Sequence, residues 1–260
     1  AALHMACQAA GVQPGNEVIT TPITFAASAN CAFYCGARPV FADINEETYN
    51  IDPENVRRLT TEKTKAVVAV DFTGQSVELD ALLSHCHEKG ITLIEDGAHV
   101  IGTKYKGRCN GSIADMTTLS FHPVKTVTCG EGGAVLTNDE NLYRKLLLYR
   151  AHGITRDPSL MEHEPDGPWY YEQLTLAMNY RMTDMQAAPL ISQLKKLPMF
   201  MERRKEIVKR YNEAFSKLPQ IIVQKEIRES DTTRHLYILR LNPEKGISAA
   251  EPDPQKCAGG

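Results

Sequence analysis

The sequence predicts an α/β fold with a mostly parallel sheet and helices on both of its faces. Short strand-like and helix-like patterns alternate along residues 1–94, and the connections between them are too short to separate domains. Two strand patterns, Ala66–Asp71 and Ile91–Ile94, are apolar along most of their length, which is typical of strands buried on both faces. Such alternation favours parallel strands joined by crossover helices in one sheet.

The elements of the first part are bounded by recognisable signals. Predicted helices cover residues 1–10, 22–36, 52–59 and 79–89, and predicted strands cover residues 17–21, 39–43, 66–71 and 91–94. We expect Pro22 to start the second helix and Gly36 to end it. Asp52 is a candidate N-cap, with Pro53 at the first helical position. Gly90 closes the last of these helices.

The second part of the chain continues with two predicted strands, residues 116–121 and 134–137. Residues 153–178 are polar and lack periodicity, which predicts a long surface loop of the kind that is often functional. Thr183 is a plausible N-cap of an amphipathic helix. We expect a solvated helix over Glu202–Lys217 and a last strand over His235–Leu241.

The composition excludes several classes of protein. A hydrophobic content of 42% and a charged content of 23% are those of an ordinary soluble globular protein. The net charge of −3 predicts no nucleic-acid partner, and the absence of an apolar run of about 20 residues predicts no membrane span. The seven scattered cysteines favour reduced thiols and a cytoplasmic location, and their spacing predicts no metal site.

A single lysine, Lys125, lies between two predicted buried strands and just before a Gly-Glu-Gly-Gly turn. Partial burial would favour its neutral amine, which is a nucleophile toward carbonyl groups. The alternative is an ordinary loop lysine in solvent, and this stretch alone does not decide between the two.

Two further residues follow predicted strand ends. Asp96 either caps the next turn or faces a cationic ligand, because a carboxylate buried there needs a partner. Phe25 is either a core residue or a stacking face for a planar cofactor. A cofactor with a pyridinium nitrogen and an aldehyde would need both Asp96 and Lys125.

Four segments in this order resemble the pyridoxal-phosphate sugar aminotransferases of the DegT/DnrJ/EryC1/StrS family. They are Thr20–Phe25, Glu95–His99, Ser120–Lys125 with Gly130–Gly133, and Asn179–Gln186. The resemblance extends to about Tyr237. The segment Val70–Glu78 is most similar to the branch of the family that aminates a UDP-linked 4-keto-6-deoxy sugar on the route to pseudaminic acid.

The resemblance implies a fold-type I aminotransferase that acts as a homodimer, with each site built from both subunits. It implies pyridoxal 5'-phosphate as the cofactor, a nucleotide-linked keto-sugar as the substrate and an amino acid, glutamate, as the donor. Residues 1–198 are then the cofactor-binding large domain without its N-terminal part. Residues 199–260 are the linking helix and a truncated small C-terminal domain, so we expect the chain to be a fragment.

The resemblance also assigns four cofactor contacts. Lys125 bonds covalently to the cofactor aldehyde and later moves a proton between cofactor and substrate. Asp96 pairs with the pyridine nitrogen, and Phe25 stacks on the ring. His99 lies beside the ring hydroxyl, at a position where many relatives have glutamine.

Phosphate and substrate contacts are implied in the same way. Ser120 is expected to hold the phosphate, and Asn179 to reach the phosphate in the neighbouring subunit. His235 and Tyr237 lie in a segment that approaches the substrate in relatives.

Two alternatives to an active transaminase remain open on the sequence. The first is a truncated, catalytically inactive homologue that only binds or dimerises. The second is a dehydratase of the same family, a branch in which histidine replaces the lysine at position 125; Lys125 argues against it.

Overall fold

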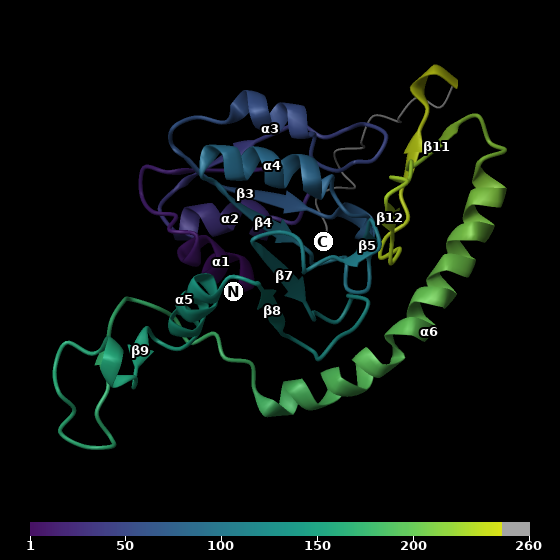
Figure 1. Cartoon of the computed structure of the whole chain (residues 1–260). Helices are drawn as coiled ribbons and strands as arrows, with labels where there is room; N and C mark the ends of the chain where they lie inside the picture. The colour runs from purple at the N-terminus through teal and green to yellow at the C-terminus, as the bar shows by residue number, and fades with distance from the viewer. Residues whose placement is uncertain (246–260) are drawn as a thin grey trace, which may run out of the picture.

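A computed structural model describes residues 1–245, and its centre is a six-stranded sheet (Figure 1). The strands are β1 (Glu17–Thr20), β2 (Arg38–Phe41), β3 (Thr64–Val70), β4 (Thr92–Asp96), β7 (Met116–Ser120) and β8 (Gly133–Leu136), in the spatial order β2-β1-β3-β4-β7-β8. Every neighbouring pair is parallel except β7 and β8, which are antiparallel. The predicted α/β fold with a mostly parallel sheet is therefore confirmed.

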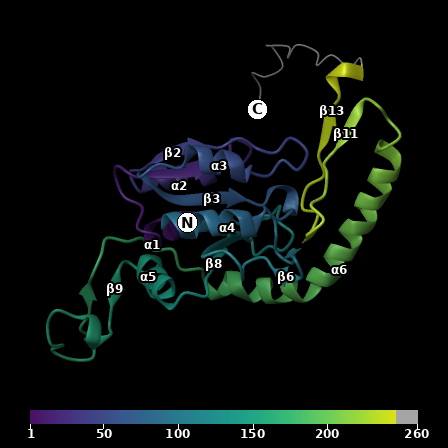
Figure 2. The ribbon, with the colours of Figure 1, turned by 45° about the horizontal axis from the view of Figure 1, so that its top comes forward.

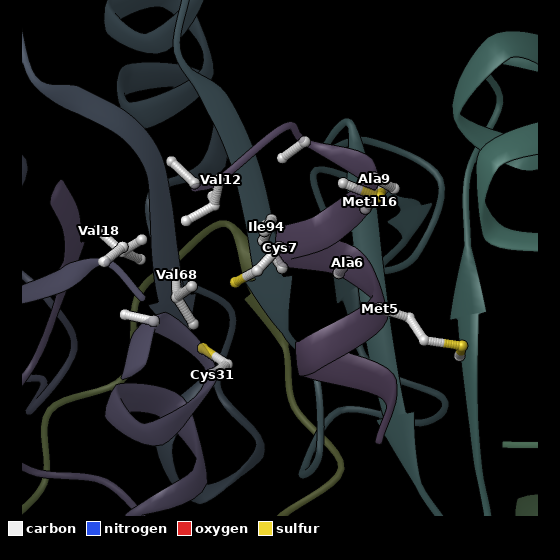
Figure 3. Close-up of a cluster of buried hydrophobic side chains, with 14 of the residues drawn as sticks. Met5, Ala6, Cys7, Ala9, Val12, Val18, Cys31, Val68, Ile94 and Met116 are labelled. Carbon is white, nitrogen blue, oxygen red and sulfur yellow. The ribbon is translucent and has the colours of Figure 1, made fainter. Parts of the chain in front are cut away.

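Helices cover both faces of this sheet, as predicted. On one face lie α1 (Ala2–Ala9), α2 (Ala27–Tyr34) and α5 (Glu140–Arg150), and on the other lie α3 (Pro53–Leu59) and α4 (Leu79–Lys89). Figure 3 shows the core on the first face, where Cys7 and Met5 of α1 pack with Val68, Ile94 and Met116 of the strands. α5 is not among the predicted elements.

The predicted helix caps are largely confirmed. The Asp52 carboxylate accepts the Glu54 N–H at 3.0 Å, and the Thr183 side chain caps α6 through the Gln186 N–H at 3.3 Å. The prediction that Pro22 starts the second helix was wrong, since α2 begins at Ala27. The Thr21 hydroxyl accepts the Ile23 N–H at 3.4 Å, and such local side-chain bonds compete with helix formation.

α6 (Asp184–Phe215) is one helix of 32 residues, about 48 Å long, that runs along the edge of the molecule (Figures 1 and 2). The solvated helix predicted over Glu202–Lys217 is confirmed as far as Phe215, where it forms the second half of α6. Pro189 and Pro198 are accommodated inside it. The predicted domain boundary at residue 198 falls within this helix and stays a prediction.

After α6 the chain returns beside it through β11 (Ile221–Val223), β12 (Ser230–Asp231) and β13 (Leu239–Leu241), followed by the short helix η3 (Pro243–Lys245) (Figure 2). Only Leu239–Leu241 of the strand predicted over His235–Leu241 forms. The preceding residues bind the body of the protein instead, as described below. β12 joins a small sheet with β5 (Lys104–Tyr105) and β6 (Arg108–Cys109).

The long loop predicted over residues 153–178 projects from the body and is pinned by a hairpin of β9 (Ile154–Thr155) and β10 (Glu172–Gln173), with the turn η2 (Pro158–Leu160) between them. Another short helical turn, η1 (Phe72–Gly74), follows β3.

Among residues 1–245, no helix combines the length and the apolar character that crossing a membrane requires. The same residues contain no cluster of three or more potential metal ligands. Cys257 and the polar tail around it lie outside the described residues.

Candidate active site

The candidate site lies where neighbouring parallel strands end on the same edge of the sheet. β3 and β4 are in register with Val70 opposite Asp96, and β4 and β7 are in register with Asp96 opposite Thr118. The residues that follow these strands, among them Asp71 and Lys125, are therefore brought to one edge. Ligands of open α/β sheets bind at this edge.

Asp96 is the last residue of β4 and is 6% exposed. Its carboxylate accepts a 2.7 Å hydrogen bond from the Ser28 hydroxyl and a 3.3 Å bond from the Ala98 N–H. Burial raises the pKa of Asp96, while Ser28, Ala98 and the charge of Lys125 oppose that rise. Ser28 was not predicted from the sequence. It lies in the first turn of α2 without any motif that would single it out.

Lys125 lies in a tight turn after β7, where its backbone N–H donates to the carbonyl of His122 at 2.9 Å. The side chain is half-buried, and burial lowers the pKa of Lys125, with the nearby Asp96 carboxylate acting against that decrease. The structure thus favours a partly desolvated amine over an ordinary solvated loop lysine.

Two imidazoles, His99 and His235, stack beside Lys125 with their ring centroids 4.4 Å apart. Burial, followed by the charge of Lys125, lowers the pKa of His99 to about 3 and that of His235 to about 4. Both rings are therefore neutral near pH 7. The Nδ1 atoms of both are buried without a hydrogen-bond partner in the described part of the chain.

The C-terminal segment is held at this edge by the turn that follows β3. The Thr232 hydroxyl donates to the carbonyl of Gly74 at 2.7 Å, and the Leu236 N–H donates to the carbonyl of Thr73 at 3.1 Å. From α6, the Arg204 guanidinium donates to the carbonyl of His235 at 3.1 Å. These bonds explain why His235 reaches a site that lies far from it in sequence.

Phe25 is 81% exposed in the loop between β1 and α2, so the core-packing alternative for this residue was wrong. The loop is connected to Asp96, because the Thr24 hydroxyl bonds that of Ser28 at 2.7 Å. Ser120 ends β7 and is half-buried, and its hydroxyl accepts the His122 N–H at 3.5 Å.

The remaining two predicted residues make other contacts. Asn179 is exposed and pairs through its backbone with Ala151, at the end of α5. The Tyr237 hydroxyl donates to the side-chain oxygen of Asn212 in α6 at 2.7 Å, and its ring lies 5.1 Å from that of Tyr211. Tyr237 also lines a small hollow of about 20 Å³ with Arg234.

The chemistry of the cluster fits a planar cofactor with a protonated ring nitrogen and an aldehyde. Asp96 offers a buried anion, Lys125 a desolvated amine, and His99 an unpaired buried ring nitrogen. The exposed Phe25 offers an apolar face. A buried carboxylate without a full counter-charge is costly, and a cationic ring would supply that charge.

The model of the DegT/DnrJ/EryC1/StrS aminotransferase family matches residues 1–251. The chain belongs to this family. Among curated DegT/DnrJ/EryC1/StrS relatives, the spore coat polysaccharide biosynthesis protein SpsC of Bacillus subtilis is 41% identical over 96% of this chain and 64% of its own length. A UDP-4-amino-4,6-dideoxy-N-acetyl-beta-L-altrosamine transaminase of Campylobacter jejuni is 40% identical over 94% of this chain and 62% of its own length.

Solved structures of DegT/DnrJ/EryC1/StrS-like aminotransferases agree. The putative sugar aminotransferase Spr1654 of Streptococcus pneumoniae, in its PMP form, superposes with a TM-score of 0.84 at 32% identity, over 93% of this chain and 65% of that one. A structure of Spr1654 in a PLP form matches with a TM-score of 0.83. The chain spans a little under two thirds of the length of these curated relatives.

Proposed function

We propose that this protein binds pyridoxal 5'-phosphate and transfers an amino group from an amino acid to a nucleotide-linked keto-sugar. The observation that carries the proposal is the pairing of Asp96 and Lys125 at adjacent strand ends, one a buried anion and the other a desolvated amine. When bound, the cofactor supplies a ring that accepts electrons from the bond being broken. The protein supplies position, charge and proton transfer.

Each residue of the cluster then has a distinct task. Lys125 would hold the cofactor through its aldehyde, and its neutral amine would carry a proton in the reaction. Asp96 faces the pyridine nitrogen and keeps it protonated by its charge. His99 lies beside the ring hydroxyl as a neutral imidazole, and Phe25 covers one face of the ring.

Ser120 is proposed to hold the phosphate of the cofactor. Asn179 is proposed to reach the phosphate of the neighbouring subunit, so that the active species is a homodimer with shared sites. The exposed position of Asn179 away from β4 in its own chain supports this assignment, because a residue in that place is available to a partner. The large domain is proposed to end at residue 198, with residues 199–260 forming the linking helix and small domain.

The substrate is proposed to be a UDP-linked 4-keto-6-deoxy sugar on the route to pseudaminic acid, with glutamate as the donor. Support comes from the 40% identity to the transaminase of Campylobacter jejuni that is named for such a sugar. His235 and Tyr237 are proposed to contact the sugar nucleotide. Of these, His235 has the stronger support, because its ring stacks on His99 beside Lys125.

The test is reductive labelling of the purified chain. Pyridoxal 5'-phosphate is added, borohydride follows, and peptide mapping locates the label. We expect a chromophore that reduction fixes on Lys125, none in the Lys125→Ala variant, and full labelling in the control Lys106→Ala, which alters an exposed lysine. Equal labelling of Lys125→Ala would contradict the proposal.

Two further outcomes separate the alternatives. A labelled chain that aminates no keto-sugar nucleotide would support the inactive homologue that only binds or dimerises. Loss of water from the sugar without amination would support the dehydratase, although that branch has histidine at the position of Lys125.

A further inference from the structure

A pair of buried acidic residues lies next to Asp96 of the candidate site. Asp71 directly follows β3, Glu95 is in β4, and both are 0% exposed. Residues Ala69 and Glu95 are opposite one another in the parallel pair, so the two carboxyl groups come from adjacent strand ends. Two ionised carboxylates in one dry space repel each other strongly and lose their hydration, so one of them is expected to keep its proton.

The contacts of Glu95 place the negative charge of the pair on that residue. Its carboxylate accepts hydrogen bonds from the Asn110 amide at 2.6 Å, the Gly111 N–H at 3.1 Å and the Thr117 hydroxyl at 2.5 Å. Three donors to one carboxylate is the arrangement that suits a buried anion.

Asp71 has a different environment. Its Oδ1 accepts the Val77 N–H at 2.8 Å, whereas its Oδ2 is buried with no donor among the described residues. Its backbone N–H donates to the carbonyl of Asp96 at 3.3 Å, which places Asp71 beside the end of β4 that carries Glu95. Because two carboxylate oxygens are both acceptors, only a proton on one of them can join them. Burial, followed by the charge and hydrogen bond of Glu95, raises the pKa of Asp71 well above its ordinary value.

We propose that Asp71 is a positioning residue that remains a neutral carboxylic acid, with its Oδ2 hydroxyl donating to Glu95 and its Oδ1 accepting from Val77. Asp71 thereby joins the ends of β3 and β4 next to Asp96 and leaves the pair with one negative charge. The part of this inference that concerns cofactor binding rests on the proposed role of Asp96. The part that concerns the proton on Asp71 does not.

The link has two consequences for the site. The Asp71–Val77 bond closes the turn whose Gly74 carbonyl accepts from the Thr103 and Thr232 hydroxyls, each at 2.7 Å. This turn holds the segment that carries His235. In addition, the charge of Glu95 raises the pKa of Asp96, so a second charge on Asp71 would act further against an ionised Asp96.

The experiment compares Asp71→Asn and Asp71→Val with the parent chain, and uses Asp166→Asn, which changes an exposed aspartate, as the control. Asparagine keeps both bonds, because its amide N–H2 donates to Glu95 and its oxygen accepts from Val77. Thermal unfolding is measured without cofactor from pH 5 to pH 8.

The sign of the pH effect follows from proton binding. The pKa of Asp71 is higher in the folded chain than in the unfolded chain, so the folded chain binds more protons between the two values and its stability falls as pH rises. Asparagine has no such loss. We therefore expect the Tm of Asp71→Asn minus the Tm of the parent to increase by about 3 °C for each unit by which the pH rises. For Asp166→Asn we expect this difference to stay constant with pH. Parallel Tm curves for parent and Asp71→Asn would overturn the proposal.

A second measurement does not depend on the Asp71 variants. The infrared band of a protonated carboxylic acid is expected at pH 8 in the parent, and in Asp96→Asn, which excludes Asp96 as its source. Absence of the band from both proteins would overturn the proposal.

The affinity for the cofactor tests whether the Asp71–Glu95 pair affects the candidate active site. We expect Asp71→Val to bind pyridoxal 5'-phosphate about tenfold more weakly and Asp71→Asn to stay within about twofold of the parent. Equal binding by Asp71→Val and the parent would overturn the link to the site. A parent chain that binds no cofactor would instead count against the proposed function, while the pH-dependent Tm gain would still test the proton on Asp71.

Discussion

At the scale of single residues, the site depends on how Asp96 is kept ionised in a buried position. Burial alone favours its neutral form, and the Ser28 hydroxyl is the first-ranking contact that favours the charged form. A hydrogen bond to a buried charge is worth more than one to an exposed charge, because water cannot replace it. Ser28 therefore supports the charge of Asp96 without being one of the residues predicted to contact the cofactor.

We expect Ser28→Ala to weaken the binding of pyridoxal 5'-phosphate by about tenfold, because the pKa of Asp96 rises when the donor is lost. Titration of cofactor absorbance measures the affinity. Ser159→Ala is a matched control, since the Ser159 hydroxyl also donates to an aspartate, Asp157, at 2.7 Å, but on the exposed surface. Unchanged affinity in Ser28→Ala would show that Asp96 stays ionised without this bond.

The site residues that could be predicted from the sequence are those that follow an apolar, strand-like run, because such residues lie at the end of a strand. Asp96 and Lys125 follow apolar strands, and parallel strands end at one edge, so their proximity follows from the pattern. Ser28 could not be found in this way, and the pattern places Asp71 at a strand end without showing which carboxyl group it faces. Their importance comes from which carboxyl group they face, and that depends on packing between elements distant in sequence.

At the scale of elements, the turn η1 connects the sheet to the C-terminal segment. Gly74 has a φ of 97°, and a Cβ there would lie 2.6 Å from the Thr233 hydroxyl and 3.0 Å from the backbone nitrogen of His235. The glycine therefore allows both the left-handed backbone and the close approach of the segment.

We expect Gly74→Ala to lower the free energy of unfolding by more than the about 1–2 kcal/mol of backbone strain alone, because the segment that carries His235 must also move. Gly107→Ala is the matched control. Its φ of 77° causes similar strain, but nothing lies within 4 Å of the added Cβ. Chemical denaturation measures both variants, and equal losses would show that the segment is not held as tightly as its contacts suggest.

Element predictions failed where tertiary structure overrides local signals. Pro22 favours a helix start, yet α2 begins at Ala27, because the Thr21 side chain accepts the Ile23 N–H instead. The strand predicted over His235–Leu241 is short because its first residues bond the turn after β3. The spacing of apolar residues along the sequence predicts neither outcome.

At the scale of the whole molecule, large apolar side chains remain exposed along α6 and near α2. They are Phe33, Tyr34, Phe41, Met185, Ile191 and Met199. Where such exposed apolar side chains lie in one patch, they are typical of surfaces that another protein covers. They agree with the proposed homodimer, in which Asn179 serves the neighbouring site.

We expect Ile191→Asp to shift the protein to a monomer, because Ile191 is 58% exposed in this chain and would be buried between α6 helices in a dimer. Sedimentation velocity measures the change. Lys209→Asp, a charge change in the same helix, is the control and should leave the oligomeric state unaltered. A dimer that persists in Ile191→Asp would show that this face of α6 is not the interface.

The length of α6 has a mechanical consequence. The Arg204 guanidinium of this helix donates to the backbone carbonyl of His235, whereas Met185 and Ile191, nearer the N-terminus of the helix, are exposed. If the proposed homodimer forms at that end, α6 would connect the partner to the two imidazoles. Association and occupation of the site would then be thermodynamically linked, each strengthening the other by the same factor.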